Sequence, residues 1–110
     1  MKKKLLLFYT LCNSEKEAQK LAKLILKENI GVCVNLLKNI KSFYVEDNQI
    51  RSDDEIGLII KSTLTEEIVI NFINKNHKYK TPFVANIRTN NVNEDYLEWA
   101  LKTKYENQKQ

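Results

Sequence analysis

Two side chains in this sequence could bind a soft metal ion. Cys33 supplies a thiol and His77 an imidazole, and these are ligand types that copper and zinc accept. Structural metal sites use about four ligands, so Met1, Cys12 or a neighbouring subunit would have to complete this pair. Alternatively, His77 only stands near the C-terminus of a helix, where the helix dipole favours it. Cys33 and His77 are therefore candidate metal ligands.

Catalysis by the same pair is not expected. Cys33 stands between Val32 and Val34, where a thiol usually serves as a small buried apolar group. The sequence offers no third residue to orient a catalytic base. It also lacks a glycine-rich phosphate loop and a nucleophile elbow. We therefore predict a protein that is not an enzyme and has no obligatory cofactor, although copper or another divalent cation could bind.

A second set of residues could line a binding cleft. Glu55 and Lys61 lie six residues apart in an apolar, β-branched segment, so on a strand their side chains face the same side. They could contact a small anion, or pair with Lys or Glu of a neighbouring subunit. Four aromatic residues combine an apolar body with a polar tip, which suits either a cleft or an interface. They are Tyr44, Tyr79, Tyr96 and Trp99.

The hydrophobic pattern predicts the elements that would position these residues. A nearly continuous apolar run over 4–11 indicates a central strand buried on both faces. Ser14 and Glu17 form a capping box that begins a helix. The helix should end near Asn29 and Gly31, because both residues tolerate a left-handed backbone.

A long hairpin over 32–62 is the most extended feature of the pattern. Its arms are rich in β-branched and aromatic residues and meet at Asp47 and Asn48, which tolerate the backbone of a tight turn. Each arm is roughly twice the usual strand length of five or six residues. The edges of such strands must be covered or must pair with another chain. The hairpin therefore predicts a partner subunit.

Two helices and one strand complete the pattern. Thr63 or Thr65 should open the second helix and Asn93 the third. The apolar residues expected on one side of these helices are Ile68, Val69, Phe72 and Ile73, then Tyr96, Leu97, Ala100 and Leu101. Alternation over 83–88 predicts a half-buried strand. The order β-α-β-β-α-β plus a helix is the ferredoxin-like α+β fold, an antiparallel sheet with two helices on one face.

Charge and hydropathy argue against nucleic acid and membrane as partners. The net charge of +4 comes from lysines interleaved with glutamates, whereas nucleic-acid surfaces cluster their charge. The segment 54–59 is acidic and aliphatic, so it lacks the stacking aromatics of RNA-recognition domains with this element order. No apolar stretch approaches the roughly 20 residues of a membrane span.

Length and cysteine content predict one cytoplasmic domain. The 110 residues suffice for one core, expected at 1–103, with a polar C-terminal tail at 104–110. The basic and apolar start imitates a signal peptide, but no small-residue cleavage site follows it. Two cysteines form neither a disulfide framework nor a zinc spacing. A reducing, cytoplasmic location is therefore expected.

The chain resembles the CutA divalent-cation tolerance family from about residue 5 to residue 101. Five short motifs occur in the expected order and spacing: Gly31–Asn35, Ser42–Tyr44, Glu55 leading to Lys61–Ser62, His77–Pro82 and Tyr96–Trp99. The resemblance implies a ferredoxin-like protomer in a homotrimer, with long hairpins wrapped around neighbours and an architecture similar to the PII signalling proteins. It also implies tolerance of copper and other divalent cations without enzymatic activity.

Two functions follow from this resemblance. The first is a metal-responsive trimeric binding protein with copper as a ligand and Cys33 and His77 as ligating residues. The alternative is a PII-like scaffold or signalling module that binds a small ligand or a protein at clefts between subunits. The six residues expected in such a cleft are Tyr44, Glu55, Lys61, Tyr79, Tyr96 and Trp99.

The chain departs from the family pattern at several positions near the cleft. Glu46 replaces a Trp, Asn48 a turn Gly, Lys78 a Pro and Phe83 an acidic residue. Thr10 stands where some members have a thiol. We expect these changes to alter the cleft and leave the fold intact.

Overall fold

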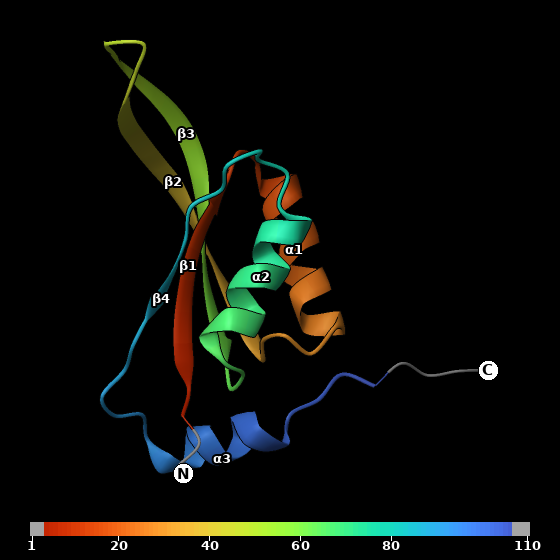
Figure 1. Cartoon of the computed structure of the whole chain (residues 1–110). Coiled ribbons are helices and arrows are strands. Elements are labelled where there is room, and N and C mark those ends of the chain that lie inside the picture. The colour runs from red at the N-terminus through yellow and green to blue at the C-terminus, as the bar shows by residue number, and fades with distance from the viewer. Residues whose placement is uncertain (1–3, 107–110) are drawn as a thin grey trace, which may run out of the picture.

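A four-stranded antiparallel sheet with the order β2-β3-β1-β4 forms the framework of the protein (Figure 1). The computed structural model describes residues 4–106. Met1 and residues 107–110 of the expected tail therefore lie outside the described residues. The elements are β1 (Leu6–Cys12), α1 (Glu15–Lys27), β2 (Cys33–Glu46), β3 (Gln49–Ser62), α2 (Glu66–Asn76), β4 (Val84–Ile87) and α3 (Glu94–Lys102). This confirms the predicted element order and the antiparallel α+β fold.

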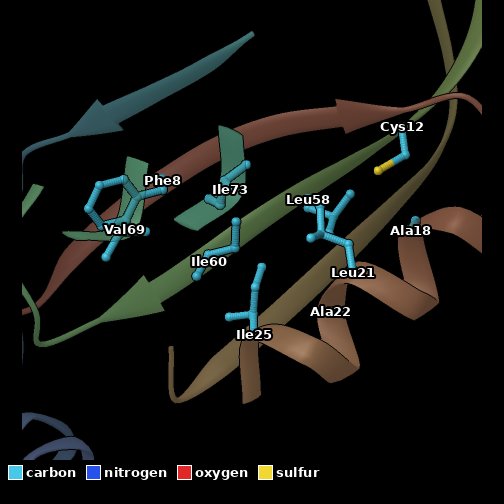
Figure 2. Packing of buried hydrophobic residues seen from close by; sticks show 10 residues of the cluster. All are labelled: Phe8, Cys12, Ala18, Leu21, Ala22, Ile25, Leu58, Ile60, Val69 and Ile73. Atoms are coloured by element: carbon cyan, nitrogen blue, oxygen red, sulfur yellow. The ribbon is translucent and has the colours of Figure 1, made fainter. Parts of the chain in front are cut away.

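Helices α1 and α2 cover one face of the sheet, whereas α3 crosses the end where β1 begins (Figure 1). The core lies between the sheet and these two helices, with Phe8, Leu58 and Ile60 from the strands buried against Ile25 and Ile73 (Figure 2). Each of these five side chains is fully buried. The amphipathic periodicity of the helices therefore supplies half of the core, and the alternation of the strands supplies the other half.

Strand β1 is buried on one face only, which corrects the expectation of burial on both. Phe8, Thr10 and Cys12 are buried on the helix side, whereas Leu7 and Leu11 are only partly buried on the opposite side. A near-continuous apolar run predicts cover on both faces, and within residues 4–106 no helix lies on the second face of the sheet. We call this second face the open face. Its apolar residues are therefore only half covered within one chain.

Helix α1 begins and ends largely as the sequence indicates. The Ser14 hydroxyl accepts a hydrogen bond from the Glu17 backbone N–H at 3.1 Å, which caps the first turn. Asn29 adopts a left-handed backbone with φ 59°, whereas Gly31 does not have a positive φ. Gly31 is needed for space instead, because a Cβ there would lie 2.8 Å from an Ile60 methyl and 3.1 Å from the Lys61 carbonyl oxygen.

Replacing Gly31 with Ala is expected to lower the free energy of unfolding by about 1–3 kcal/mol, because the added methyl overpacks a site walled partly by backbone. Gly57→Ala is the matched comparison, since the atoms nearest to its added Cβ belong to the side chains of Ile40 and Tyr9 and not to backbone. Those side-chain ends can move, so Gly57→Ala should cost less. Urea unfolding of both variants checks this, and an equal loss at the two positions would contradict the argument.

The hairpin of β2 and β3 projects well beyond the helices (Figure 1). Each strand has 14 residues, and Glu46 pairs with Gln49 across the predicted two-residue turn. Asp47 and Asn48 both have a positive φ, at 53° and 60°, as the tight hairpin turn requires. Asn48 therefore occupies the family's glycine position without losing the turn.

Helices α2 and α3 are less buried than their patterns indicate. Thr65, and not Thr63, precedes α2, and neither Thr65 nor Asn93 makes a side-chain capping bond. Ile68 is 48% exposed, so the expectation that it belongs to the buried stripe of α2 is wrong. Leu101 of α3 is 43% exposed. Both helices are short, so each presents fewer side chains to the core than its apolar count suggests. None of the helices within residues 4–106 is long and apolar enough to cross a membrane.

The start of the expected polar tail is fixed to the domain. The Tyr105 backbone N–H donates to Asn29 Oδ1 at 2.7 Å, and Asn29 Nδ2 donates back to the Tyr105 carbonyl at 3.0 Å. The left-handed Asn29 therefore also anchors the segment that follows α3.

Candidate functional site

An open groove of about 990 Å³ lies where the hairpin passes the loop between α2 and β4. Three of the predicted cleft residues line it, namely Tyr44, Glu55 and Tyr79. The remaining lining residues are Leu11, Asn13, Ser42, Phe43, Asp53, Asp54, Thr81 and Phe83. The lining holds three carboxylates and no Lys, Arg or His. Lys41 Nζ, which is not part of the lining, pairs with Asp54 Oδ1 at 2.9 Å. Asp53 and Glu55 therefore give the groove the negative charge that favours cationic groups.

Two tyrosines orient the carboxylates of this groove. The Tyr79 hydroxyl donates to Glu55 Oε2 at 2.7 Å, and the Tyr44 hydroxyl donates to Asp53 Oδ2 at 2.7 Å. Burial and then the bond to Glu55 raise the pKa of Tyr79, whereas the bond to Asp53 is the main cause that raises the pKa of Tyr44. Both phenols therefore stay protonated at neutral pH and hold the carboxylates as acceptors.

The other three predicted cleft residues form a separate group, which we call the Lys61 corner. Lys61 Nζ lies 5.1 Å from the centroid of the Tyr96 ring, within cation–π range. The Tyr96 and Trp99 rings pack at 5.2 Å with an interplanar angle of 53°. Lys61 and Glu55 lie six positions apart on strand β3, which is roughly 20 Å. A single chain therefore brings the six residues together as two groups and not as one cleft.

Both ring nitrogens of His77 are engaged in hydrogen bonds. Nδ1 accepts from the Tyr79 backbone N–H at 3.0 Å, which places the proton on Nε2. Nε2 then donates to the Leu11 carbonyl oxygen at 2.7 Å. His77 follows the last residue of α2, as the helix-end alternative expected. A metal ion could bind this ring only by displacing one of the two bonds.

One chain does not bring Cys33 and His77 together. Cys33 pairs with Lys61, and Lys61 pairs with Leu7 near the start of β1. His77 lies at the other end of β1, where its Nε2 is 3.9 Å from Cys12 Sγ. The thiol beside His77 is therefore Cys12, which ends β1 and is buried in the core (Figure 2).

The sequence indicates Cys12 only as an additional metal ligand, because Cys12 and His77 are 65 residues apart and no local pattern shows that they are neighbours. The register of β1 with β4 brings the segment before β4 to the end of β1, and this register is visible only in the structure. Within residues 4–106, no group of three or more His, Cys, Asp and Glu side chains is arranged to hold a metal ion. A complete metal site would therefore need a second subunit.

A smaller cavity of about 330 Å³ opens beside Cys12 and His77. Lys20, Lys75 and Lys78 line it together with Glu17, whose carboxylate lies 3.9 Å from Lys78 Nζ. Three ammonium groups against one carboxylate repel a divalent cation on this side. The groove near Glu55 is therefore the electrostatically favoured approach for cations.

Of the departures from the family pattern, Phe83 lines the groove, whereas Glu46 and Lys78 lie outside its lining. Phe83 lines the groove where an acidic residue was expected, and its ring packs edge-on to Tyr9 at 6.1 Å. Glu46 pairs with Arg51 at 3.3 Å near the hairpin turn. Lys78 is exposed and turned toward Glu17. Phe83 thus replaces a charge with apolar surface at the edge of the groove.

Burial should make Cys12 an unreactive thiol in the folded protein. Burial, reinforced by the nearby Glu17 and Glu55 charges, raises the pKa of Cys12 to about 11. At pH 8 the thiolate fraction is then on the order of 0.1%, against roughly a quarter for an unfolded thiol of pKa near 8.5. A Cys33→Ser variant, which leaves Cys12 as its only thiol, should react with iodoacetamide at least about 100-fold more slowly when folded than in urea. The folded rate should rise about tenfold per pH unit between pH 8 and pH 10, and a plateau near pH 9 would contradict the raised pKa.

Comparisons with known proteins agree with one another along nearly the whole chain. Residues 6–103 match the family model described as CutA1 divalent ion tolerance protein. The divalent-cation tolerance protein CutA of Pyrococcus horikoshii is 34% identical over 100 residues, covering 89% of this chain and 96% of the relative. The chloroplastic protein CutA of Arabidopsis thaliana is 34% identical over 97 residues, covering 86% of this chain and 52% of the relative.

A solved structure shows the same arrangement of elements. The crystal structure of divalent ion tolerance protein CutA1 from Ehrlichia chaffeensis superposes with a TM-score of 0.86 at 27% identity, covering 92% of this chain and 95% of that one. The likeness spans the long hairpin as well as the sheet and helices, because nearly all of both chains is covered.

Proposed function

The chain belongs to the CutA1 divalent ion tolerance protein family, and we propose that it acts as a homotrimer that binds copper. It is a non-catalytic divalent-cation tolerance protein. The observation that carries the proposed cation binding is the groove at Glu55, where Asp53 and Glu55 stand without a basic side chain in the lining and Asp54 is paired with Lys41. Such a groove draws divalent cations toward the protein surface.

The trimer is supported by surfaces that one chain leaves uncovered. At the hairpin tip, Phe43, Val45 and Ile50 are 71%, 74% and 79% exposed, and the register places all three on one side of the ribbon. Strand β2 forms the edge of the sheet along 14 residues. Long apolar edge strands call for a covering chain. Light scattering should give three times the chain mass of 13.0 kDa, and a value near 13.0 kDa would rule out the trimer.

For copper we propose a soft site that includes His77. This site would depend on thiolate and imidazole ligands, because the three lysines beside Cys12 and His77 disfavour a cation electrostatically. Cys33 and His77 can share an ion only across subunits, because they lie at opposite ends of β1 in one chain. Cys12 can share it within one subunit. Cuprous titration of the wild type, Cys33→Ser, Cys12→Ser and His77→Ala under reducing conditions distinguishes these arrangements. We expect His77→Ala to weaken binding most, and equal millimolar binding in all four proteins would exclude the soft site.

A PII-like module that binds a small ligand or a protein between subunits is the second candidate. The specific observation in its favour is that the six cleft residues form two groups, one acidic with two tyrosines and one cationic with a tyrosine and a tryptophan. A thermal-shift screen of small metabolites should then find a ligand whose effect is lost in Tyr79→Phe and Trp99→Leu. Copper binding together with an empty screen would favour the first function.

The cytoplasm remains the proposed location. Cys12 and Cys33 are both free thiols, as a reducing compartment favours. The chloroplastic name of the Arabidopsis relative shows that similar chains also occur in another compartment. Fractionation with an antibody against the native chain would test the proposal.

A further inference from the structure

The groove and the Lys61 corner carry opposite charges, and of the three groove carboxylates only Asp54 has a basic partner within the described residues, Lys41 at 2.9 Å. The groove presents Asp53, Asp54 and Glu55 without a basic side chain in its lining. Within residues 4–106, no carboxylate lies within 4.0 Å of Lys61 Nζ, which rests over the Tyr96 ring instead. Each surface therefore presents the charge that the other lacks.

The two surfaces cannot meet within one chain. Glu55 and Lys61 lie on the same rigid strand, six residues and roughly 20 Å apart, and both face the open side of the sheet. The open face also holds half-buried apolar residues such as Leu7 and Leu11, so it is the face that another copy would cover. A contact between the groove and the Lys61 corner must therefore join two copies.

Such a contact has a defined symmetry. The groove of one copy meets a different surface of the next copy, so the interface is heterologous, and heterologous contacts close into rings when the rotation permits. A ring of three copies would use every groove and every Lys61 corner once. Such a contact favours a closed ring and is compatible with the proposed trimer, without depending on apolar burial alone.

We infer that Lys61 of one copy inserts its ammonium group into the groove of the next copy and pairs with Glu55 there. The inference rests on the proposed homotrimer and names the residues that would join it. Tyr79 already binds Glu55 Oε2, so Oε1 is the oxygen that can accept the incoming ammonium. Tyr96 and Trp99 accompany Lys61 and bring aromatic surface to the groove wall.

Charge reversal and its rescue test this pairing. Lys61→Glu and Glu55→Lys should each raise the dissociation constant of the trimer on the order of 100-fold, because each places like charges together at every interface. The double variant restores opposite charges and should return the constant to within about tenfold of wild type. Analytical ultracentrifugation over a dilution series measures all four proteins.

Two controls keep the result interpretable. Lys23→Glu and Glu28→Lys reverse the same charges at exposed positions of α1 and at its C-terminal end, and they should leave assembly unchanged. If a reversal variant does not fold by circular dichroism, Lys61→Met and Glu55→Gln replace it, and each should weaken assembly about tenfold.

A wild-type monomer would overturn the proposed trimer itself. A wild-type trimer whose single variants assemble normally, or whose double variant is not rescued, would overturn only the Lys61–Glu55 pairing.

Discussion

A variant with both Val45 and Ile50 replaced by Lys is expected to be a monomer of about 13.0 kDa, whereas the unmodified chain should have three times that mass. The two side chains pair across the hairpin near its tip and are 74% and 79% exposed in one chain. Burying an aliphatic side chain of this size contributes about 1.5–3 kcal/mol. A trimer would bury three copies of each, so the double substitution removes a large part of the association free energy and adds six charges to the interface.

The matched control places the same charge on the other side of the hairpin. Gln49 is exposed and lies next to Ile50, but its side chain points to the opposite face of the ribbon. Gln49→Lys should therefore assemble nearly as the wild type does. Size-exclusion chromatography with light scattering measures the mass of the double variant and of Gln49→Lys. A Val45→Lys/Ile50→Lys variant that remains trimeric would show that the apolar tip is not buried by assembly.

The fold could be predicted from sequence wherever local chemistry decides the outcome. Asp47 and Asn48 are both small polar residues that accept a positive φ, and the hairpin turns there. Ser14 is followed by Glu17 at the spacing of a cap, and the cap forms. Gly31 was interpreted by the same local logic and the interpretation was wrong, because its need for space comes from Ile60 and Lys61 in a strand distant in sequence.

The site could be predicted only as a set of residue types. Glu55 and Tyr79 were both named, but their hydrogen bond depends on how the loop after α2 folds over the end of β1. The pairing of His77 with Cys12 in place of Cys33 depends on register, which no single sequence segment specifies. Asp53 and Asp54 were missed because an acidic run on a hairpin also suits a solvated edge.

The two groups of cleft residues would take part both in subunit assembly and in ligand binding. Tyr44, Glu55 and Tyr79 have their hydrogen-bond partners within one chain, so the acidic groove exists before assembly. Lys61 lacks a carboxylate partner within residues 4–106. A cation bound in the groove would therefore compete with Lys61 of a neighbour, and cation binding and assembly would be coupled through the same carboxylates.

Replacing Phe8 with Ala is expected to lower the free energy of unfolding by about 3–5 kcal/mol. Phe8 is fully buried on β1, where its backbone pairs with Ile60 on one side and Asn86 on the other. Its ring packs beside Val69 of α2 (Figure 2). The surrounding strands are held by hydrogen bonds on both sides, so they cannot collapse into the space that the ring leaves.

Urea unfolding in the Val45→Lys/Ile50→Lys background measures this cost without a contribution from assembly. Phe83→Ala is the matched control, because Phe83 is 56% exposed and packs mainly edge-on to Tyr9. Phe83→Ala should lower the free energy of unfolding by about 1 kcal/mol, the size expected for a partly exposed aromatic pair. A domain of this length has a total stability of roughly 5–15 kcal/mol, so Phe8→Ala alone should remove a large fraction of it. A loss below about 1.5 kcal/mol would mean that α2 moves to fill the space, and the core between β1 and α2 would then be less rigid than its burial indicates.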